Sequence, residues 1–205
     1  MKHLLAHATA ALALACVVPA SPALAASVTL TGSFNQDDDV RLFSFNVDNS
    51  SPVTLRTTSV AAGGFDTILT LFNSSGAFLA ENDGPATSFV PDDAMIQQSM
   101  APATYILALT EFDNFHLTGP GGVLSDGFER TGQGNFTASQ FGSSPSDIAF
   151  IDVTGAQRTS NFSLTLNNVS SASAVPEPAT FAIFIFGLAG IAGIRFVGRQ
   201  SSNRS

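Results

Sequence analysis

The chain is poor in several residue types, and each shortage excludes a kind of chemistry. Cys16 is the single cysteine among 205 residues, and tryptophan is absent. After residue 25 the sequence has one histidine, His116, and no cysteine. That part of the chain therefore has no disulfide, no thiol nucleophile and no Cys-ligated zinc. A lone histidine also supplies too few nitrogen or sulfur ligands for a zinc centre.

Positive charge is scarce as well. Residues 26–174 hold twelve Asp, three Glu, four Arg and no Lys, which gives a net charge of −11 with histidine neutral. Nucleic acid and anionic lipid both bind through positive groups that displace counterions, so we expect no nucleic-acid partner. An acidic surface suits surroundings rich in cations or polysaccharide, although many secreted proteins are acidic without a special partner.

The first 25 residues have the order of features typical of a secretory signal peptide. Lys2 provides a basic start, residues 4–18 form an apolar run, and residues 23–25 (Ala-Leu-Ala) match the small-x-small pattern of signal peptidase. We expect cleavage after residue 25, with cleavage after residue 26 as the alternative. Cys16 lies inside this segment, but Ala13 stands where a lipidation motif has a large aliphatic residue, which argues against a lipoprotein.

Residues 26–169 show short alternations of apolar and polar residues separated by turn residues, which predicts an all-β domain. The expected strands are residues 28–34, 41–47, 53–57, 67–72, 77–81, 103–111, 147–153 and 161–169. Two packed antiparallel sheets, a β-sandwich of seven to nine strands, would bury such faces. The expected core includes Leu55, Leu69, Leu71, Tyr105, Leu107, Leu109, Phe162 and Leu164.

A long stretch rich in Gly, Ser and Asn, residues 112–146, interrupts the strand pattern. A loop of this size is usually functional or disordered. Its spaced phenylalanines argue against simple disorder, because disordered tracts are poor in aromatic residues. Phe65, Phe112, Phe115 and Phe128 would be able to stack on sugar rings if they were exposed; the alternative is that they anchor the core or the loop.

The C-terminal region has three consecutive parts. We expect residues 170–174 to be a small-residue linker, followed by the motif Val175, Pro176, Glu177 and Pro178. Residues 181–194 are uncharged and apolar, and residues 179–198 would be long enough to cross a bilayer if Arg195 snorkels to the interface. Arg195, Arg199 and Arg204 then favour a cytoplasmic C-terminus.

This arrangement resembles the PEP-CTERM sorting signal, because the Val-Pro-Glu-Pro motif, the apolar helix and the basic end follow one another at the terminus. The resemblance covers residues 175–204. It implies handling by an exosortase, a membrane transpeptidase-like enzyme of Gram-negative bacteria that make exopolysaccharide. It further implies an exported protein, anchored in the inner membrane before processing and found afterwards at the cell surface or outside the cell. The alternative is a plain C-terminal membrane anchor.

The middle of the chain is similar to the FDP domain found on such proteins, and through it to the bacterial pre-peptidase C-terminal (PPC) β-sandwich, with a jelly-roll-like fold. The matching segments are residues 37–40, 63–66, 69–72, 82–83, 102–105 and 132–137. Two positions depart from the pattern: Thr67 stands where the family usually has Pro, and Gly84 where it usually has an acid. The resemblance implies a fold and a location but no activity.

Calcium is the cofactor that the loop residues best suit, since it takes six to eight oxygen ligands. Asp66, Asn82, Asp83, Asp92 and Asp93 all lie at strand ends around one predicted hairpin. No EF-hand or nonapeptide repeat is present. The alternative is that these residues simply form turns.

Catalytic motifs are lacking. His116 has Asp113 and Ser125 nearby in sequence, but no Gly-x-Ser-x-Gly elbow is present, and we expect His116 to be an exposed loop residue. Glycosidase chemistry needs two positioned carboxylates, and nothing in the sequence selects a pair. We therefore expect a non-enzymatic surface or extracellular-matrix protein. The alternatives are a carbohydrate-binding or adhesion module that recognises exopolysaccharide and, less favoured, a hydrolase with a carboxylate site.

Overall fold

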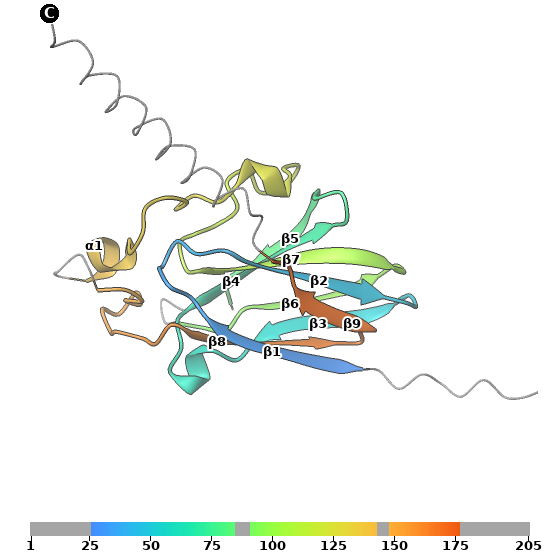
Figure 1. The fold of residues 1–205 in the computed structure, drawn as a ribbon, viewed down its shortest axis with the longest axis horizontal. Helices are drawn as coiled ribbons and strands as arrows, with labels where there is room; N and C mark the ends of the chain where they lie inside the picture. Colours follow the sequence, from blue (N-terminus) through green and yellow to red (C-terminus); the bar gives the residue numbers. More distant parts are fainter. Residues whose placement is uncertain (1–25, 85–90, 143–147, 177–205) are drawn as a thin grey trace, which may run out of the picture.

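The computed structural model describes residues 26–84, 91–142 and 148–176, which form two antiparallel sheets packed face to face (Figure 1). One sheet has the strand order β1-β8-β3-β6, and the other has the order β5-β4-β7-β2-β9. The strands are β1 (Ser27–Ser33), β2 (Arg41–Val47), β3 (Ser51–Thr57), β4 (Thr67–Asn73), β5 (Phe78–Asn82), β6 (Met95–Met100), β7 (Ala103–Glu111), β8 (Asn161–Asn167) and β9 (Ser171–Ala174). The predicted antiparallel sandwich is confirmed for the described part of the chain.

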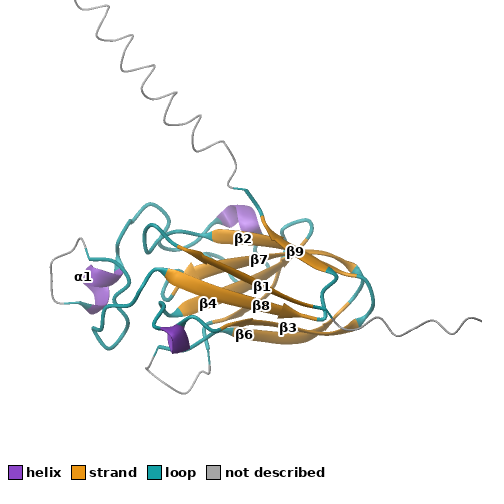
Figure 2. Ribbon diagram, turned by 60° about the horizontal axis from the view of Figure 1, so that its bottom comes forward, coloured by secondary structure: helices purple, strands orange, loops and turns teal. Residues whose placement is uncertain are grey.

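The main core lies between the sheets because alternate residues of each strand point inward. On β2 these are Phe43, Phe45 and Val47, which meet residues of the opposite sheet such as Leu55 and Leu164. All eight residues expected in the core are buried, with Tyr105 the most exposed of them at 8%. Figure 2 shows the two strand layers in a second view, with the short helices lying outside them.

Three strand predictions were wrong. Met95–Met100, which carries two adjacent glutamines, was not expected and forms edge strand β6, paired with β3. The expected strand at residues 147–153 is absent from its described part, where Ile151 makes a single bridge to Gln157 around a turn held by Asp152. The expected linker at residues 170–174 contains β9, because its small side chains let it lie along the edge strand position beside β2.

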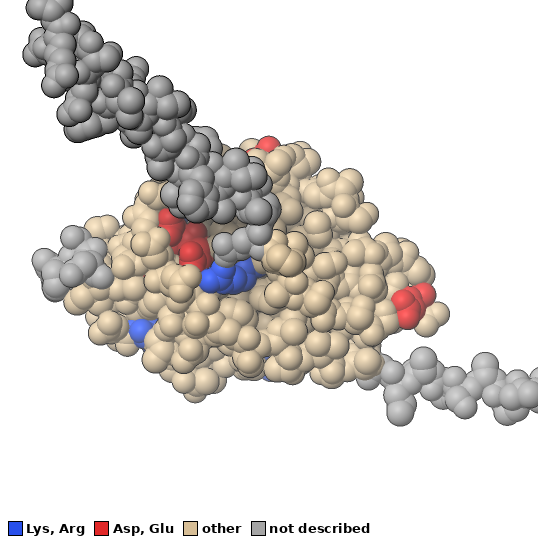
Figure 3. Space-filling model, in the orientation of Figure 1, with Lys and Arg blue, Asp and Glu red and all other residues tan. Residues whose placement is uncertain are grey.

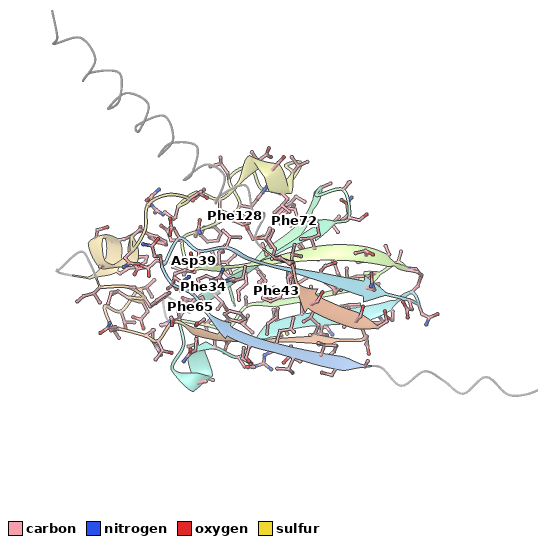
Figure 4. All side chains as sticks on the ribbon, viewed as in Figure 1. Phe34, Asp39, Phe43, Phe65, Phe72 and Phe128 are labelled. Carbon is pink, nitrogen blue, oxygen red and sulfur yellow. The ribbon has the colours of Figure 1, made fainter. Side chains whose placement is uncertain are left out.

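A second apolar cluster covers the outer face of the five-stranded sheet. Phe72 and Phe128 are its buried aromatic residues, and Figure 4 places both above the inter-sheet residues Phe34 and Phe43. The long loop supplies this cover and returns to the edge of β5, where the carbonyl of Gly122 accepts the N–H of Phe78 at 3.0 Å. In its described part, residues 112–142, the loop also forms the short helices η2 (Leu124–Asp126) and α1 (Thr137–Phe141).

Both expected targeting segments lie outside the described residues. The expected signal peptide covers residues 1–25, before the first described residue, and the expected membrane span at residues 179–198 follows the last one, residue 176. Within the described ranges, no helix has the length and apolar character needed to cross a bilayer.

Candidate functional site

The segment Gly63-Gly64-Phe65-Asp66 leads into β4 at one end of the sandwich. Gly63 closes the short helix η1 (Val60–Ala62) with φ of +84°, a conformation that glycine adopts without strain. Gly64 forms a parallel bridge with Thr159, which places the following residue inside the core. Phe65 is fully buried, with ring centroids 4.6 Å from Phe34 and 5.5 Å from Phe150. Figure 4 shows Phe34 and Phe65 together between the layers.

Four acidic side chains are buried near this end of the core: Asp37, Asp66, Glu111 and Asp152, each at most 4% exposed. Part of the domain's negative charge is therefore interior. On the face seen in Figure 3, the visible acids form small separate groups and no continuous acidic surface.

Asp37 connects two segments that are distant in sequence. Its carboxylate accepts the N–H and the hydroxyl of Thr137, with the N–H at 2.9 Å, and the N–H of Phe150 at 2.8 Å. The neighbouring Asp38 accepts the N–H of Gly132 at 2.9 Å. Residues 37–40 and 132–137 thus lie together, and the acidic turn at Asp37 and Asp38 holds the long loop in place.

Glu111 is the least compensated of the buried acids. It ends β7 on the inward-facing side, is 1% exposed, and its Oε2 has no hydrogen-bond partner in the structure. Burial raises the pKa of Glu111 well above its ordinary value of 4.5, and the charges of Asp37, Asp66 and Asp152 raise it further. Burial and the neighbouring carboxylates therefore both favour the protonated form of Glu111 in the folded protein.

Asp66 is the buried member of the calcium candidate set. Burial raises the pKa of Asp66 to about 7, and the nearby charges of Asp83 and Asp92 add to the shift, while the N–H of Asp92 opposes it by donating to Oδ1 at 3.3 Å. The structure thus brings these three acids into one electrostatic environment. A cation placed there would relieve the repulsion.

The other two residues of the calcium candidate set, Asn82 and Asp93, already accept hydrogen bonds from backbone N–H groups. Asn82 Oδ1 accepts the N–H of Gly84 at 3.0 Å and of Met95 at 2.7 Å, and Asp93 Oδ1 accepts the N–H groups of Ser59 and Val60 at 2.6 and 3.2 Å. Among the residues that the structure describes, no three His, Cys, Asp or Glu side chains form a group that could hold a metal ion. Residues 85–90, between Gly84 and the two later acids, lie outside the description.

Gly84 and Thr67 each have a local structural role. Gly84 has φ of +111°, and a Cβ there would lie 2.8 Å from the Cβ of Asp92, so an acid does not fit without rearrangement. Thr67 is fully buried, and its hydroxyl lies 2.7 Å from that of Thr57. The Thr67–Thr57 contact connects β4 to β3 across the sandwich.

His116 was expected to be exposed, and that prediction was wrong. It is 3% exposed, because the rings of Phe72, Phe78 and Phe128 surround it at centroid distances of 5.1 to 5.7 Å. Nε2 lies 3.0 Å from the carbonyl of Val123, and Nδ1 accepts the N–H of Gly119 at 3.1 Å. Both ring nitrogens are thus engaged in shaping the loop.

The candidate sugar-stacking phenylalanines separate into two pairs. Phe65 and Phe128 are buried, so both anchor the core or the loop, and neither is exposed for stacking on a sugar. Phe112 and Phe115 are half-buried, with centroids 6.0 Å apart, and Phe141 lies 6.0 Å from Phe112. Phe112, Phe115 and Phe141 are therefore the partly exposed aromatic side chains in the described part of the long loop.

Comparison with known proteins identifies no family for this chain. No protein-family profile matches the chain, and no curated protein matches it. Among solved structures, the pre-peptidase C-terminal domain of a collagenase from Bacillus anthracis aligns with 11% sequence identity and a TM-score of 0.36, covering 72% of this chain and 89% of that one.

Sequence reasoning overlooked Glu111 and treated Asp37 only as part of an acidic turn. A signal for Glu111 was present, since Tyr105, Leu107 and Leu109 occupy alternate inward positions and Glu111 continues the same alternation. Nothing local indicated that Asp37 would bind residues 100 and 113 positions away.

Proposed function

We propose that this chain is an exported, non-enzymatic cell-surface or extracellular-matrix protein whose C-terminal signal is processed by an exosortase. The observation that carries the proposal is the ordered tail: the Val175–Pro178 motif, the apolar residues 181–194 and three following arginines. The prolines resist helix formation just outside the membrane, and Glu177 resists entry into it. The apolar run then halts export, and the arginines retain the end inside.

A non-enzymatic role is supported by what the polar side chains already do. His116 has both ring nitrogens engaged, and Asp37 and Asp93 bind backbone N–H groups that hold loops to the sheets. A general base or nucleophile needs a side chain with access to substrate. These residues are instead committed to the fold.

The sorting proposal is tested in a strain that contains the enzyme and in its deletion mutant. Mass spectrometry of the exported protein should find a C-terminus near residues 175–179 in the first strain, and the deletion should leave the intact tail in the membrane fraction. Pro178→Ala serves as a motif variant, with Asn203→Ala as a control beyond the motif. If protein from the enzyme-positive strain still carries residues 181–205, the tail is a plain anchor.

Exopolysaccharide binding is the second candidate, supported by the half-buried rings of Phe112, Phe115 and Phe141. A glycan array on the exported domain, followed by a binding isotherm for each hit, tests it. Saturable binding that Phe115→Ala abolishes and Phe78→Leu preserves would favour a recognition module. Binding that does not saturate would leave the surface-protein proposal alone.

A further inference from the structure

The last described strand extends to the first residue of the proposed sorting motif. β9 pairs antiparallel with β2, with Ala174 opposite Phe43 and Ser171 opposite Asn46. The ladder continues one residue further, because the N–H of Val175 donates to the carbonyl of Leu42 at 2.8 Å. The motif therefore begins directly at the end of the hydrogen-bonded ladder, with no linker residue between them.

Side chains fix the beginning of β9 as well. Asn46 Nδ2 donates to Ser171 Oγ at 2.9 Å, and the hydroxyl of Ser170 donates to Asp48 Oδ1 at 2.8 Å. Ala172 packs against the main core between the sheets. The strand is therefore tied to the domain by its backbone, by two side-chain hydrogen bonds and by burial, although it has only four residues.

β9 also protects an apolar strand. It is the terminal strand of its sheet, so without it the next edge would be β2, whose sequence is RLFSFNV. An exposed edge of that composition is a template for pairing with other chains. Pro176, which is exposed, has no N–H to offer an added strand, and proline is tolerated at such an edge.

We propose that β9 sets the upstream limit of C-terminal processing, so that the sorting enzyme cuts at Pro176 or later and the mature protein keeps β9. This inference rests on the proposed function and defines how its site is presented. The four residue steps from Val175 to the expected start of the membrane span at residue 179 reach at most about 14 Å when extended. The enzyme therefore works against the domain surface beside Leu42.

Two variants separate the role of the strand from a general effect of proline. The alternation of an antiparallel ladder directs the N–H of Ser173 toward β2, as it does that of Val175, and directs the N–H of Ala174 away from it. Ser173→Pro should release β9, whereas Ala174→Pro should leave it in place.

Elastase, which cuts after small residues, tests the strand on the purified full-length chain in detergent. We expect the wild-type and Ala174→Pro proteins to keep residues 170–174 and to be cut at residue 175 or later. Ser173→Pro should be cut within or before residues 170–174 at least tenfold faster. If the wild-type protein loses β9 as fast as the Ser173→Pro variant, the inference is overturned.

The C-terminus of the exported protein in the enzyme-positive strain provides the second measurement. A mature end at residue 175 or later supports the inference, and a mature end before residue 175 overturns it while leaving the sorting proposal intact. An uncut tail combined with elastase protection of β9 overturns the sorting proposal and, with it, the processing limit. In that outcome β9 remains only an edge-protecting strand.

Discussion

Gly64 lies so close to Asn161 that a Cβ built on the glycine would be 2.2 Å from the asparagine carbonyl oxygen. The N–H of Gly64 also donates to the carbonyl of Ser59 at 2.8 Å, and that oxygen would lie 2.9 Å from the same Cβ. Backbone surrounds the position, so neither neighbour can turn aside as a side chain would. Glycine is therefore required at position 64, because the carbonyl of Asn161 leaves no room for a Cβ.

Gly64→Ala should lower the free energy of unfolding by about 1–3 kcal/mol, the usual cost of forcing an added methyl group into a packed site. Urea denaturation followed by fluorescence of Tyr105 measures it. Gly63→Asn is the matched control, because Gly63 has open space around its Cβ position and Asn tolerates positive φ. Equal stability losses in the two variants would contradict the close-approach argument.

Glu111 should make the domain less stable as pH rises. Below pH 4.5 the carboxyl is protonated in both the folded and the unfolded chain. Above it the unfolded chain releases the proton and the folded chain retains it, so the free energy of unfolding falls by up to about 1.4 kcal/mol per pH unit until the raised folded pKa is reached. Asp66 contributes with the same sign between pH 3.8 and about 7.

The substitution Glu111→Gln removes this titration and should flatten the decline in stability above pH 4.5. Denaturation curves at four pH values measure the slope, and the exposed Glu129→Gln is the control. An unchanged slope in Glu111→Gln would show that the buried carboxyl is not the group responsible.

Calcium should raise the midpoint of thermal unfolding if Asp66, Asp83 and Asp92 bind it, because a ligand that binds only the folded state stabilises it by mass action. The measurement compares millimolar calcium, magnesium and chelator. Asp83→Asn should abolish the shift, and the exposed Asp48→Asn should preserve it. Identical midpoints with calcium and chelator would end the calcium hypothesis.

His116→Ala should loosen the long loop more than it destabilises the sandwich. The change removes a ring packed among three phenylalanines and the two hydrogen bonds to Val123 and Gly119. We expect a loss of about 2 kcal/mol and faster protease cleavage within residues 117–127. His116→Phe keeps the packing without the hydrogen bonds, so an intermediate cleavage rate would confirm that both contribute. A cleavage rate equal to the wild type in His116→Ala would contradict the structural role.

The sequence by itself determined which chain segments form most of the sandwich. Alternation in segments such as residues 41–47 and 103–111 predicts inward and outward faces, because successive side chains of a strand point in opposite directions. The turn at Asn73–Gly76 also depends on nearby residues alone. Asn73 Oδ1 accepts two backbone N–H groups, and Gly76 has φ of +85°. These features depend on residues close together in the chain.

Tertiary structure alone decided the elements with weak local signals and the environment of the polar residues. β6 is interrupted by two adjacent glutamines and β9 has only small residues, and both form strands because β3 and β2 offer open edges. The burial of His116 and the raised pKa of Glu111 depend on rings and carboxyls contributed by distant segments. Backbone pairing at a sheet edge and the desolvation of a charge are set by what surrounds a residue in space, and local sequence does not encode those surroundings.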